Sequence, residues 1–433
     1  MSHRLLPTDA QTYWMSAKIP NDQFLLFCFD TDASADSVRA ELLRNASGVD
    51  ELHLRITDTR WGLTFPRWDP MAVGDGHVRE HDSASTWNNC LGGVADLVAD
   101  QLDPRETTWR IHLFADVTHA PRGAGPALVA ILQISHALGD GRTASALARR
   151  LFGDSAAHPD PIVDSGRPSP TNRFAGAREA AKAERRLAAD TEAGVVPPQA
   201  PGRTKTRVDV APDGPIAVRT VVRNRCDFTA PGISVTVGAL TAVSHALTRY
   251  LTMHGDSAPA DLGAEVTLSK PGARRARNHF RNAGVGLHPT TTDLVERARS
   301  IGRDLSERRT RAAHPAMQAS SLAAEMVPAA LLRWGIRQFD ATAVPERVTG
   351  NTVVSSVARG DAGLVVGGGR VRFTAGFPAL SPVMGLTHGV HGIGDSVTLG
   401  VMSAHSAVPD PDVYEQLLRR AVDDVADAFA RVT

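Results

Sequence analysis

The stretch of sequence at residues 127–151 constrains the fold most strongly. Residues 127–134 are apolar at nearly every position, which is typical of a strand covered on both faces in the middle of a sheet. After Gly141 the pattern changes, and Ala144, Leu147 and Leu151 recur at helical spacing. The sequence therefore predicts a strand, a tight loop and a helix in this region.

The loop at residues 135–141 reads Ser-His-Ala-Leu-Gly-Asp-Gly and places His136 four residues before Asp140. A neutral imidazole can take a proton from a hydroxyl or amine as that group attacks a carbonyl, and then return the proton to the leaving group. Loops held by rigid elements are where such chemistry usually lies. The loop thus favours acyl transfer by His136, and a histidine packed in the core beside an Asp-Gly turn stays open as the alternative.

The chain has 433 residues, which is more than one hydrophobic core usually holds, so two domains are expected. Between about residues 154 and 215 the composition shifts to Pro, Asp, Ser, Gly and Arg, interrupted by a charged, Ala-rich helix at about 174–194. We interpret this region as a crossover linker. The predicted organisation is an N-terminal subdomain at 1–165, a linker at 166–214 and a C-terminal subdomain at 215–433.

Hydrophobic patterning predicts further elements on both sides of the linker. Strands are expected at 24–29, 109–114, 216–222, 352–357, 363–366 and 371–373, with 109–114 pairing to 127–134. Helices are expected at 35–43, after a Ser234 cap, and after Asp410-Pro411. The glycines at 367–369 are interpreted as a turn, because a strand rather than a helix follows them and a phosphate loop would need a helix.

The chain carries 47 basic and 47 acidic residues, so no overall field attracts nucleic acid. The odd, widely spaced set Cys28, Cys90 and Cys226 fits neither a disulfide framework nor a zinc knuckle and indicates a reducing compartment. Neither a signal peptide nor an apolar run of about 18 residues is recognisable. A cytoplasmic protein is expected; residues 331–339 have the mixed apolar and arginine character of a peripheral membrane contact, although a core-facing helix is favoured there.

His388 and His391 lie three residues apart. His391 precedes Asp395 by four residues, the same spacing as between His136 and Asp140. Because Gly394-Asp395 lies between two apolar alternating runs, we interpret it as a hairpin turn and expect no second active site. The sequence has no His-Glu-x-x-His motif, Cys pair or Gly-x-Ser-x-Gly elbow. Catalysis without metal or cofactor is therefore expected.

Several short blocks along the chain occur in the order of the motifs of one known family. Residues 6–10 look like its opening Ser-Pro-x-Asp segment, and residues 135–141 look like its His-His-Ala-Leu-x-Asp-Gly motif. Later matching blocks are 235–240, 265–270, Asn282, 355–357 and the strand pair 369–371 and 381–383. Over nearly its whole length the chain resembles the bacterial wax ester synthase/diacylglycerol acyltransferase family, in the superfamily of CoA-dependent acyltransferases and condensation domains.

This resemblance implies an α/β fold with mixed sheets, in two chloramphenicol-acetyltransferase-like subdomains with a tunnel between them. Acyl-CoA and a hydroxyl acceptor would enter from opposite mouths as substrates, to form wax esters, triacylglycerols or related esters. His136 would be the general base, Asp140 a structural residue paired with Lys270, and Gly141 a point of close approach. The candidates for oxyanion or substrate contacts are Ser355, Ser356 and Asn282.

The chain departs from the family pattern at several motif positions. Ser135 replaces the first motif histidine, Gly238-Ala239 replaces Asn-Asp, Ser356 replaces an Asn, and Ala-Arg-Gly at 358–360 replaces Pro-Gly-Pro. An acyl-CoA-dependent O-acyltransferase is the favoured function, with an acyl carrier protein and a membrane or lipid-droplet surface as further partners to test. A degenerate acyl-binding protein and a condensation-type enzyme with an amine acceptor or carrier-protein donor stay open as alternatives.

Overall fold

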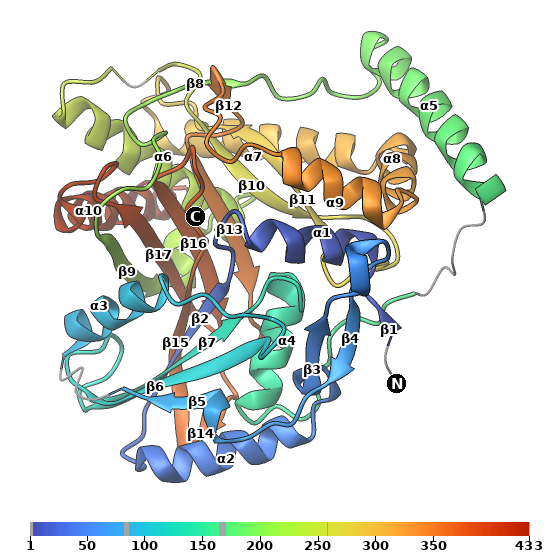
Figure 1. The fold of residues 1–433 in the computed structure, drawn as a ribbon. Helices are drawn as coiled ribbons and strands as arrows, with labels where there is room; N and C mark the ends of the chain where they lie inside the picture. Colours follow the sequence, from blue (N-terminus) through green and yellow to red (C-terminus); the bar gives the residue numbers. More distant parts are fainter. Residues whose placement is uncertain (1–2, 82–85, 164–169, 258, 433) are drawn as a thin grey trace.

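The computed structural model describes residues 3–81, 86–163, 170–257 and 259–432, and two six-stranded sheets form its body (Figure 1). The N-terminal sheet has the strand order β14-β15-β2-β7-β6-β5. Its strands are β2 (Gln23–Phe29), β5 (Val78–Glu80), β6 (Trp109–Val117), β7 (Ala127–Ile134), β14 (Val365–Val366) and β15 (Gly369–Phe377). The predicted pairing of β6 with β7 is confirmed and is antiparallel.

The C-terminal sheet has the strand order β11-β10-β13-β16-β17-β9. Its strands are β9 (Ile216–Asn224), β10 (Gly263–Ser269), β11 (Phe280–Gly286), β13 (Thr352–Ala358), β16 (Leu386–Ile393) and β17 (Ser396–Ala404). Strand β13 runs parallel to both β10 and β16, whereas the other pairs of this sheet are antiparallel. The predicted α/β class with mixed sheets is confirmed.

Helices and two small sheets surround these large sheets. The helices are α1 (Pro7–Ser16), α2 (Ala35–Ser47), α3 (Trp87–Leu97), α4 (Gly141–Leu151), α5 (Pro170–Glu192), α6 (Val235–Met253), α7 (Leu294–Ala312), α8 (Pro315–Glu325), α9 (Ala329–Gln338) and α10 (Pro411–Ala430). The small sheets contain β1 (His3–Arg4), β3 (Leu54–Thr57) and β4 (Arg67–Pro70), and β8 (Arg203–Thr204) with β12 (Arg347–Val348). Helix α5 lies at the edge of the molecule and packs against α8 (Figure 1).

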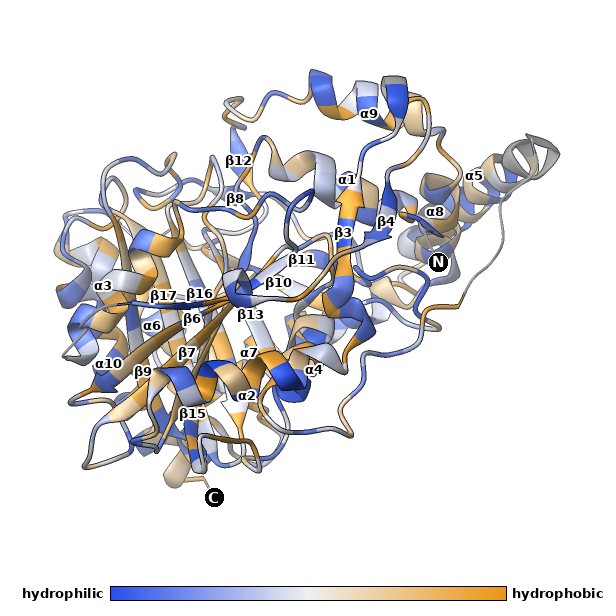
Figure 2. Cartoon of the chain, turned by 60° about the horizontal axis from the view of Figure 1, so that its bottom comes forward, coloured by the Kyte–Doolittle hydropathy of each residue, from blue (hydrophilic) through white to orange (hydrophobic). Residues whose placement is uncertain are grey.

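Strand β7 is buried at every position because it lies between two hydrophobic cores. Leu128 and Leu132 face a core that includes residues of α2 and α4, whereas Val129 and Ile131 face a core shared with α3 and strands β9 and β17. This alternation explains the continuous apolar run, since each face of the strand has its own partner. Figure 2 shows the same distribution, with hydrophobic colour on the central strands and hydrophilic colour on the outer loops.

The core beneath α3 joins the two sheets, and β15 is the strand that crosses between the halves of the chain. β15 follows the C-terminal strand β13 in sequence, yet it pairs with β2, with Phe373 opposite Cys28. Sheet membership therefore does not follow sequence order at 365–377. The predicted boundaries at 165 and 215 stay a prediction.

Local predictions from turn and cap residues are confirmed. Ser234 accepts a hydrogen bond from the Val237 amide at the start of α6, and Asp410 does the same for Val413 at the start of α10. Gly367 and Gly368 have positive φ in the β14–β15 hairpin, and Gly394 does in the β16–β17 hairpin. These turns need residues that tolerate the left-handed region, so the sequence marks them directly.

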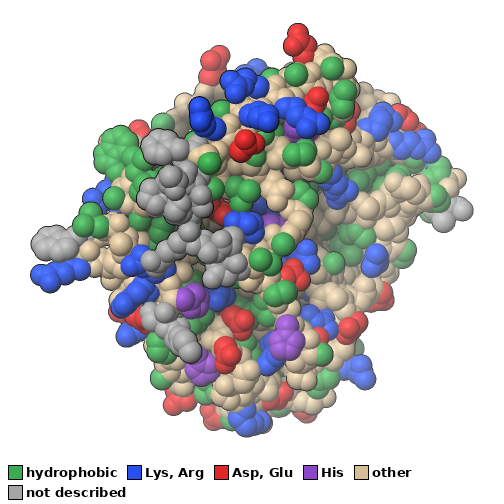
Figure 3. Space-filling view, turned by 90° about the vertical axis from the view of Figure 1, so that its right-hand side faces the viewer, with side chains coloured by type: hydrophobic (Ala, Val, Ile, Leu, Met, Phe, Trp, Pro, Cys, Tyr) green, Lys and Arg blue, Asp and Glu red, His purple; other side chains and the backbone are tan. Residues whose placement is uncertain are grey.

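Helix α9 faces the core only in part. Ile336 is buried, whereas Leu331 and Trp334 are more than half exposed, so the favoured core-facing interpretation holds for one side of the helix only. Contact of this segment with a membrane surface stays a prediction. Within the described residues, no helix is both long and apolar enough to cross a membrane. On the face in Figure 3, basic, acidic and hydrophobic side chains are interspersed.

Candidate active site

His136 lies in the turn between β7 and α4, where its ring is held by an amide. Nδ1 of His136 is 2.8 Å from Oδ1 of Asn278, and Nδ2 of Asn278 donates to the His136 carbonyl oxygen (2.9 Å) and to Oδ1 of Asp9 (3.1 Å). Because both of these donor contacts use the amide nitrogen, Oδ1 of Asn278 must accept, and Nδ1 of His136 carries the proton of the neutral ring. The lone pair of Nε2 is left to accept a proton.

Asp9 holds this amide in place from the first turn of α1. Its side chain is fully buried and accepts hydrogen bonds from the backbone N–H groups of Arg277 (3.1 Å) and Asn278 (3.0 Å). Burial raises the pKa of the Asp9 carboxyl against the effect of these hydrogen bonds. The N-terminal block at 6–10 thus contacts the loop motif through Asn278, in the opposite half of the chain.

Asp140 is a structural residue in this geometry. It caps α4 by accepting a hydrogen bond from the Thr143 amide (3.1 Å), and it accepts a second backbone hydrogen bond from the His279 amide (3.0 Å). Nη2 of Arg274 donates to both of its carboxylate oxygens (2.9 and 2.8 Å). Burial by itself would raise the pKa of the Asp140 carboxyl, but the hydrogen bonds and charge of Arg274 outweigh it, and the pKa is lowered. The carboxylate of Asp140 therefore stays ionised near pH 7.

The prediction that Lys270 pairs with Asp140 is wrong. Lys270 follows directly after β10 and lines a separate small pocket with Glu325. Arg274, four residues further along the chain, forms the ion pair with Asp140 at the start of α4. A planar guanidinium can bind a carboxylate through two N–H groups at once, which an ammonium cannot do. The sequence signal was the arginine-rich stretch at 274–277, but its spacing does not tell which arginine points inward.

His136, Asp140 and Gly141 line a cavity of about 280 Å³ whose other walls come from both large sheets. More than half of the side chains that line it are polar or charged. A Cβ atom added to Gly141 would lie 3.3 Å from Cγ2 of Val357; the predicted close approach of a substrate at Gly141 stays a prediction. Burial lowers the pKa of His136, against hydrogen bonds that include the one with Asn278, so the ring is neutral near pH 7.

The three predicted oxyanion or substrate residues all line this cavity, but they differ in their contacts. Ser356 Oγ is 2.8 Å from Oγ1 of Thr236, and Asn282 donates to the carboxylate of Glu265. Ser355, on β13, has neither of these contacts and is partly exposed. Of the two hydroxyls, the one of Ser355 is therefore the freer to meet a substrate.

Sequence reasoning missed two further cavity residues, Arg359 and His391. His391 was assigned to a hairpin strand, which is correct, but its ring lies against Gly376 of β15 and lines the cavity. Glycine at 376 and 389 permits this, because a Cβ at either position would collide with the His391 ring or the facing backbone. The Gly-x-His pattern at 389–391 was the sequence feature that could have indicated this position of the His391 ring.

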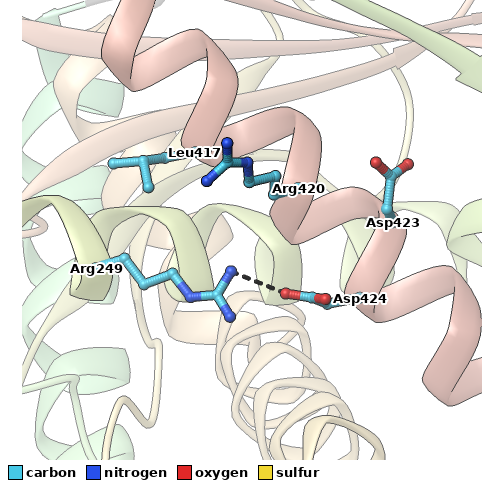
Figure 4. A pocket seen from close by; sticks show the side chains of 5 residues that line it. All are labelled: Arg249, Leu417, Arg420, Asp423 and Asp424. Carbon is cyan, nitrogen blue, oxygen red and sulfur yellow. Dashed lines mark ion pairs between the residues drawn. The ribbon is translucent and has the colours of Figure 1, made fainter.

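A second depression lies on the surface between α6 and α10 (Figure 4). Three of its four charged side chains are paired: Arg249 with Asp424 at 2.8 Å, and Asp423 with Arg223 at 2.9 Å. It holds no histidine or nucleophile, so it is a poor candidate for catalysis. Across the described part of the chain, no group of three or more His, Cys, Asp or Glu side chains is placed to hold a metal ion.

Residues 278–426 match the model of the WS/DGAT C-terminal domain family. This part of the chain is similar to that family. The WS/DGAT match begins at Asn278, the residue that orients His136, and covers Arg359 and His391. The resemblance found in the sequence is thereby confirmed, and it supports an acyltransferase. No curated protein sequence matches the chain significantly.

Solved structures share the fold over the whole chain. The wax ester synthase/diacylglycerol acyltransferase from Marinobacter aquaeolei VT8 is 17% identical with a TM-score of 0.64, and the match covers 98% of this chain and 100% of that one. A starter condensation domain of rhizomide synthetase in complex with C8-CoA and Leu-SNAC is 12% identical with a TM-score of 0.58, covering 100% and 95%. The trichothecene 15-O-acetyltransferase from Fusarium sporotrichioides is 13% identical with a TM-score of 0.56, covering 99% and 95%. At these identities the likeness establishes the fold of two acyltransferase-like subdomains.

Proposed function

We propose that this WS/DGAT-like chain transfers an acyl group from acyl-CoA to a hydroxyl acceptor, with His136 as the general base. The observation that carries the proposal is the contact between His136 and Asn278, because it fixes the Nδ1–H tautomer and leaves Nε2 as the basic nitrogen in a cavity. No cofactor is needed for this chemistry, since the thioester itself supplies the activated acyl group.

In this mechanism Nε2 of His136 takes the proton of the acceptor hydroxyl while its oxygen attacks the thioester carbonyl. The new C–O bond forms, and the tetrahedral oxyanion is stabilised by a hydrogen-bond donor, for which Ser355 is the candidate. The C–S bond then breaks, and the imidazolium returns the proton to the CoA sulfur. The Arg274–Asp140 pair takes no proton and serves to hold the loop.

The two alternatives differ in what the acceptor assay would show. A condensation-type reaction is suggested by the likeness to a condensation domain bound to C8-CoA and Leu-SNAC, and it would use an amine in place of the hydroxyl. A degenerate binding protein would bind acyl-CoA without turnover. The hydrogen-bonded arrangement of His136, Asn278 and Asp9 favours an active enzyme over the degenerate form, because such a network orients a base.

The test is a thiol-release assay with purified protein, acyl-CoA donors of short, medium and long chain, and matched alcohols and amines. We expect release of CoA thiol that depends on the alcohol, together with an ester product identified by mass spectrometry. Turnover with amines alone would replace the O-acyltransferase assignment by the condensation-type one. Failure of every acceptor and donor, including carrier-protein-bound acyl groups, would contradict acyl transfer.

The pH dependence follows from the pKa of His136. Because burial lowers this pKa below its ordinary value of 6.5, we expect kcat/KM to rise with pH through an ionisation below pH 6.5 and to be level at pH 7. The base is lost when the ring is protonated, so activity falls on the acid side. Rates from about pH 4.5 to 8.5 measure this, and a half-maximal point above pH 7 would be inconsistent with His136 as described.

Replacing Asn278 by alanine tests whether it positions the base. We expect kcat to fall about 10- to 100-fold, since losing buried hydrogen bonds costs about 1–3 kcal/mol. The acid limb, which is the part of the pH profile where the rate rises with pH, should also move to lower pH. The reason is that the hydrogen bond with Asn278 raises the pKa of His136. Asn282→Ala is the matched control and should leave the limb in place. A fall in kcat with no movement of the limb would indicate a merely structural role.

A further inference from the structure

The guanidinium of Arg359 is buried in the cavity, and none of the described residues pairs with it as a counter-ion. Arg359 follows the last residue of β13, is 3% exposed and lines the same cavity as His136. Its Nε and Nη1 atoms are buried and have no hydrogen-bond partner within the described part of the chain. Burial lowers the pKa of Arg359 to about 9, so the side chain is still charged at pH 7.

The carboxylates of the cavity wall are engaged elsewhere. Asp140 is paired with Arg274, and Asp22 accepts hydrogen bonds from the Leu102 amide (2.7 Å) and from Nε2 of Gln133 (2.8 Å). The charge of Arg359 is stabilised by the ring of Phe27, whose centroid lies 5.4 Å from Cζ. An aromatic face leaves the N–H groups of a guanidinium unsatisfied, and buried charges are normally paired.

His391 adds a second unpartnered group beside Arg359. Its side chain is 5% exposed, and Nδ1 is buried without a partner among the described residues. Burial and the positive charge of Arg359 lower the pKa of His391 well below its ordinary value, so the ring is neutral and can donate one N–H. A fixed cation and a neutral donor thus face one space, an arrangement complementary to a carboxylate.

We propose that Arg359, assisted by His391, binds a carboxylate carried by a substrate of the transfer reaction. This inference rests on the proposed function and names the class of substrate. Arg359 is deep in the cavity that holds His136, so the carboxylate belongs to the acyl group or to the acceptor, close to the reacting carbonyl. The phosphates of CoA are separated from the thioester by the length of the pantetheine arm and would lie elsewhere.

Binding tests the site without any turnover. We expect succinate to raise the Tm of the parent protein and to leave the Tm of Arg359→Met unchanged, because a ligand that binds only the folded state stabilises it. Arg420→Met, which changes an exposed arginine at the surface depression in Figure 4, is the matched control and should respond to succinate as the parent does. Without succinate, Arg359→Met should be at least as stable as the parent, because it removes an unpaired buried charge.

Three results would overturn the proposal: an equal succinate shift in Arg359→Met and the parent, a shift with inorganic phosphate but not with succinate, or a less stable Arg359→Met protein without ligand. The last would mean that Arg359 serves the fold. These outcomes are readable even if no acyl transfer is ever detected, so failure of the proposed function and failure of this site are distinguishable.

Kinetics then locates the carboxylate on one of the two substrates. One arm compares succinyl-CoA with butyryl-CoA on a neutral alcohol, and the other compares a hydroxy acid with its amide on acetyl-CoA. In one arm the parent should have a higher kcat/KM for the carboxylate substrate than for its neutral counterpart. Arg359→Met should lower the ratio of these two kcat/KM values about 100-fold, which is the effect of truncating a buried charge partner. A ratio unchanged in both arms would contradict the proposal.

Discussion

Replacing His136 by alanine is expected to lower kcat/KM for acyl transfer about 100- to 10,000-fold, the usual contribution of a general base. The variant loses the basic nitrogen at the turn between β7 and α4, while Asn278 keeps its hydrogen bonds to Asp9 and to the carbonyl oxygen of residue 136. The measurement is thiol release with the best donor and acceptor pair from the substrate panel.

His405→Ala is a suitable control for this substitution, since His405 is exposed and does not line the cavity. Circular dichroism and the unfolding temperature of both variants should match the parent. If His136→Ala retained activity within a few-fold of the parent, His136 would not be the base, and the proposed mechanism would have to be abandoned.

Replacing Arg274 by methionine is expected to lower the free energy of unfolding by about 3–5 kcal/mol, because it leaves Asp140 as an unpaired buried charge. The side chains of Arg274 and Asp140 are only 6% and 7% exposed. Arg274 also donates to Oγ1 of Thr143 (2.8 Å), so the pair ties a C-terminal segment to the start of α4. Denaturant unfolding followed by circular dichroism measures the loss.

Arg142→Met is the matched control, because the Arg142 side chain is 61% exposed in its ion pair with Asp160 and such pairs contribute less than about 1 kcal/mol. The loss in Arg274→Met should also depend on pH. The folded state lowers the pKa of Asp140, so its contribution is complete above the unfolded pKa of about 3.9 and is lost as pH falls through the folded value. A loss that is equally large near pH 3 would speak against the ion pair as its cause.

Strand β7 and the loop that follows it show how much of the fold could be predicted from the sequence. The apolar run at 127–134 predicted a strand covered on both faces, and the change to helical spacing after Gly141 predicted α4, because both patterns are local consequences of which side chains are buried. Turn glycines and the caps Ser234 and Asp410 were equally readable, since each satisfies a backbone requirement within a few residues. The position of His136 at a strand end followed from these elements.

The contacts of the site were decided by the tertiary structure. Asn278 and Arg274 were not predicted, and Lys270 was predicted in error, because the turn at 270–279 brings its side chains to the loop from 134 or more residues away in sequence. The crossing of β15 to the N-terminal sheet has the same origin, since strand pairing across such separations is not encoded in local periodicity.

The sequence by itself determined the elements, their burial patterns and the residue types of the motif, because hydrophobic period, capping and turn geometry act over a few residues. Only the tertiary structure decided which groups face His136, and which buried charge, that of Arg359, has no counter-ion among the residues described. Charge pairing depends on distance and burial in space, and two segments far apart in the chain acquire those only when the two sheets pack together.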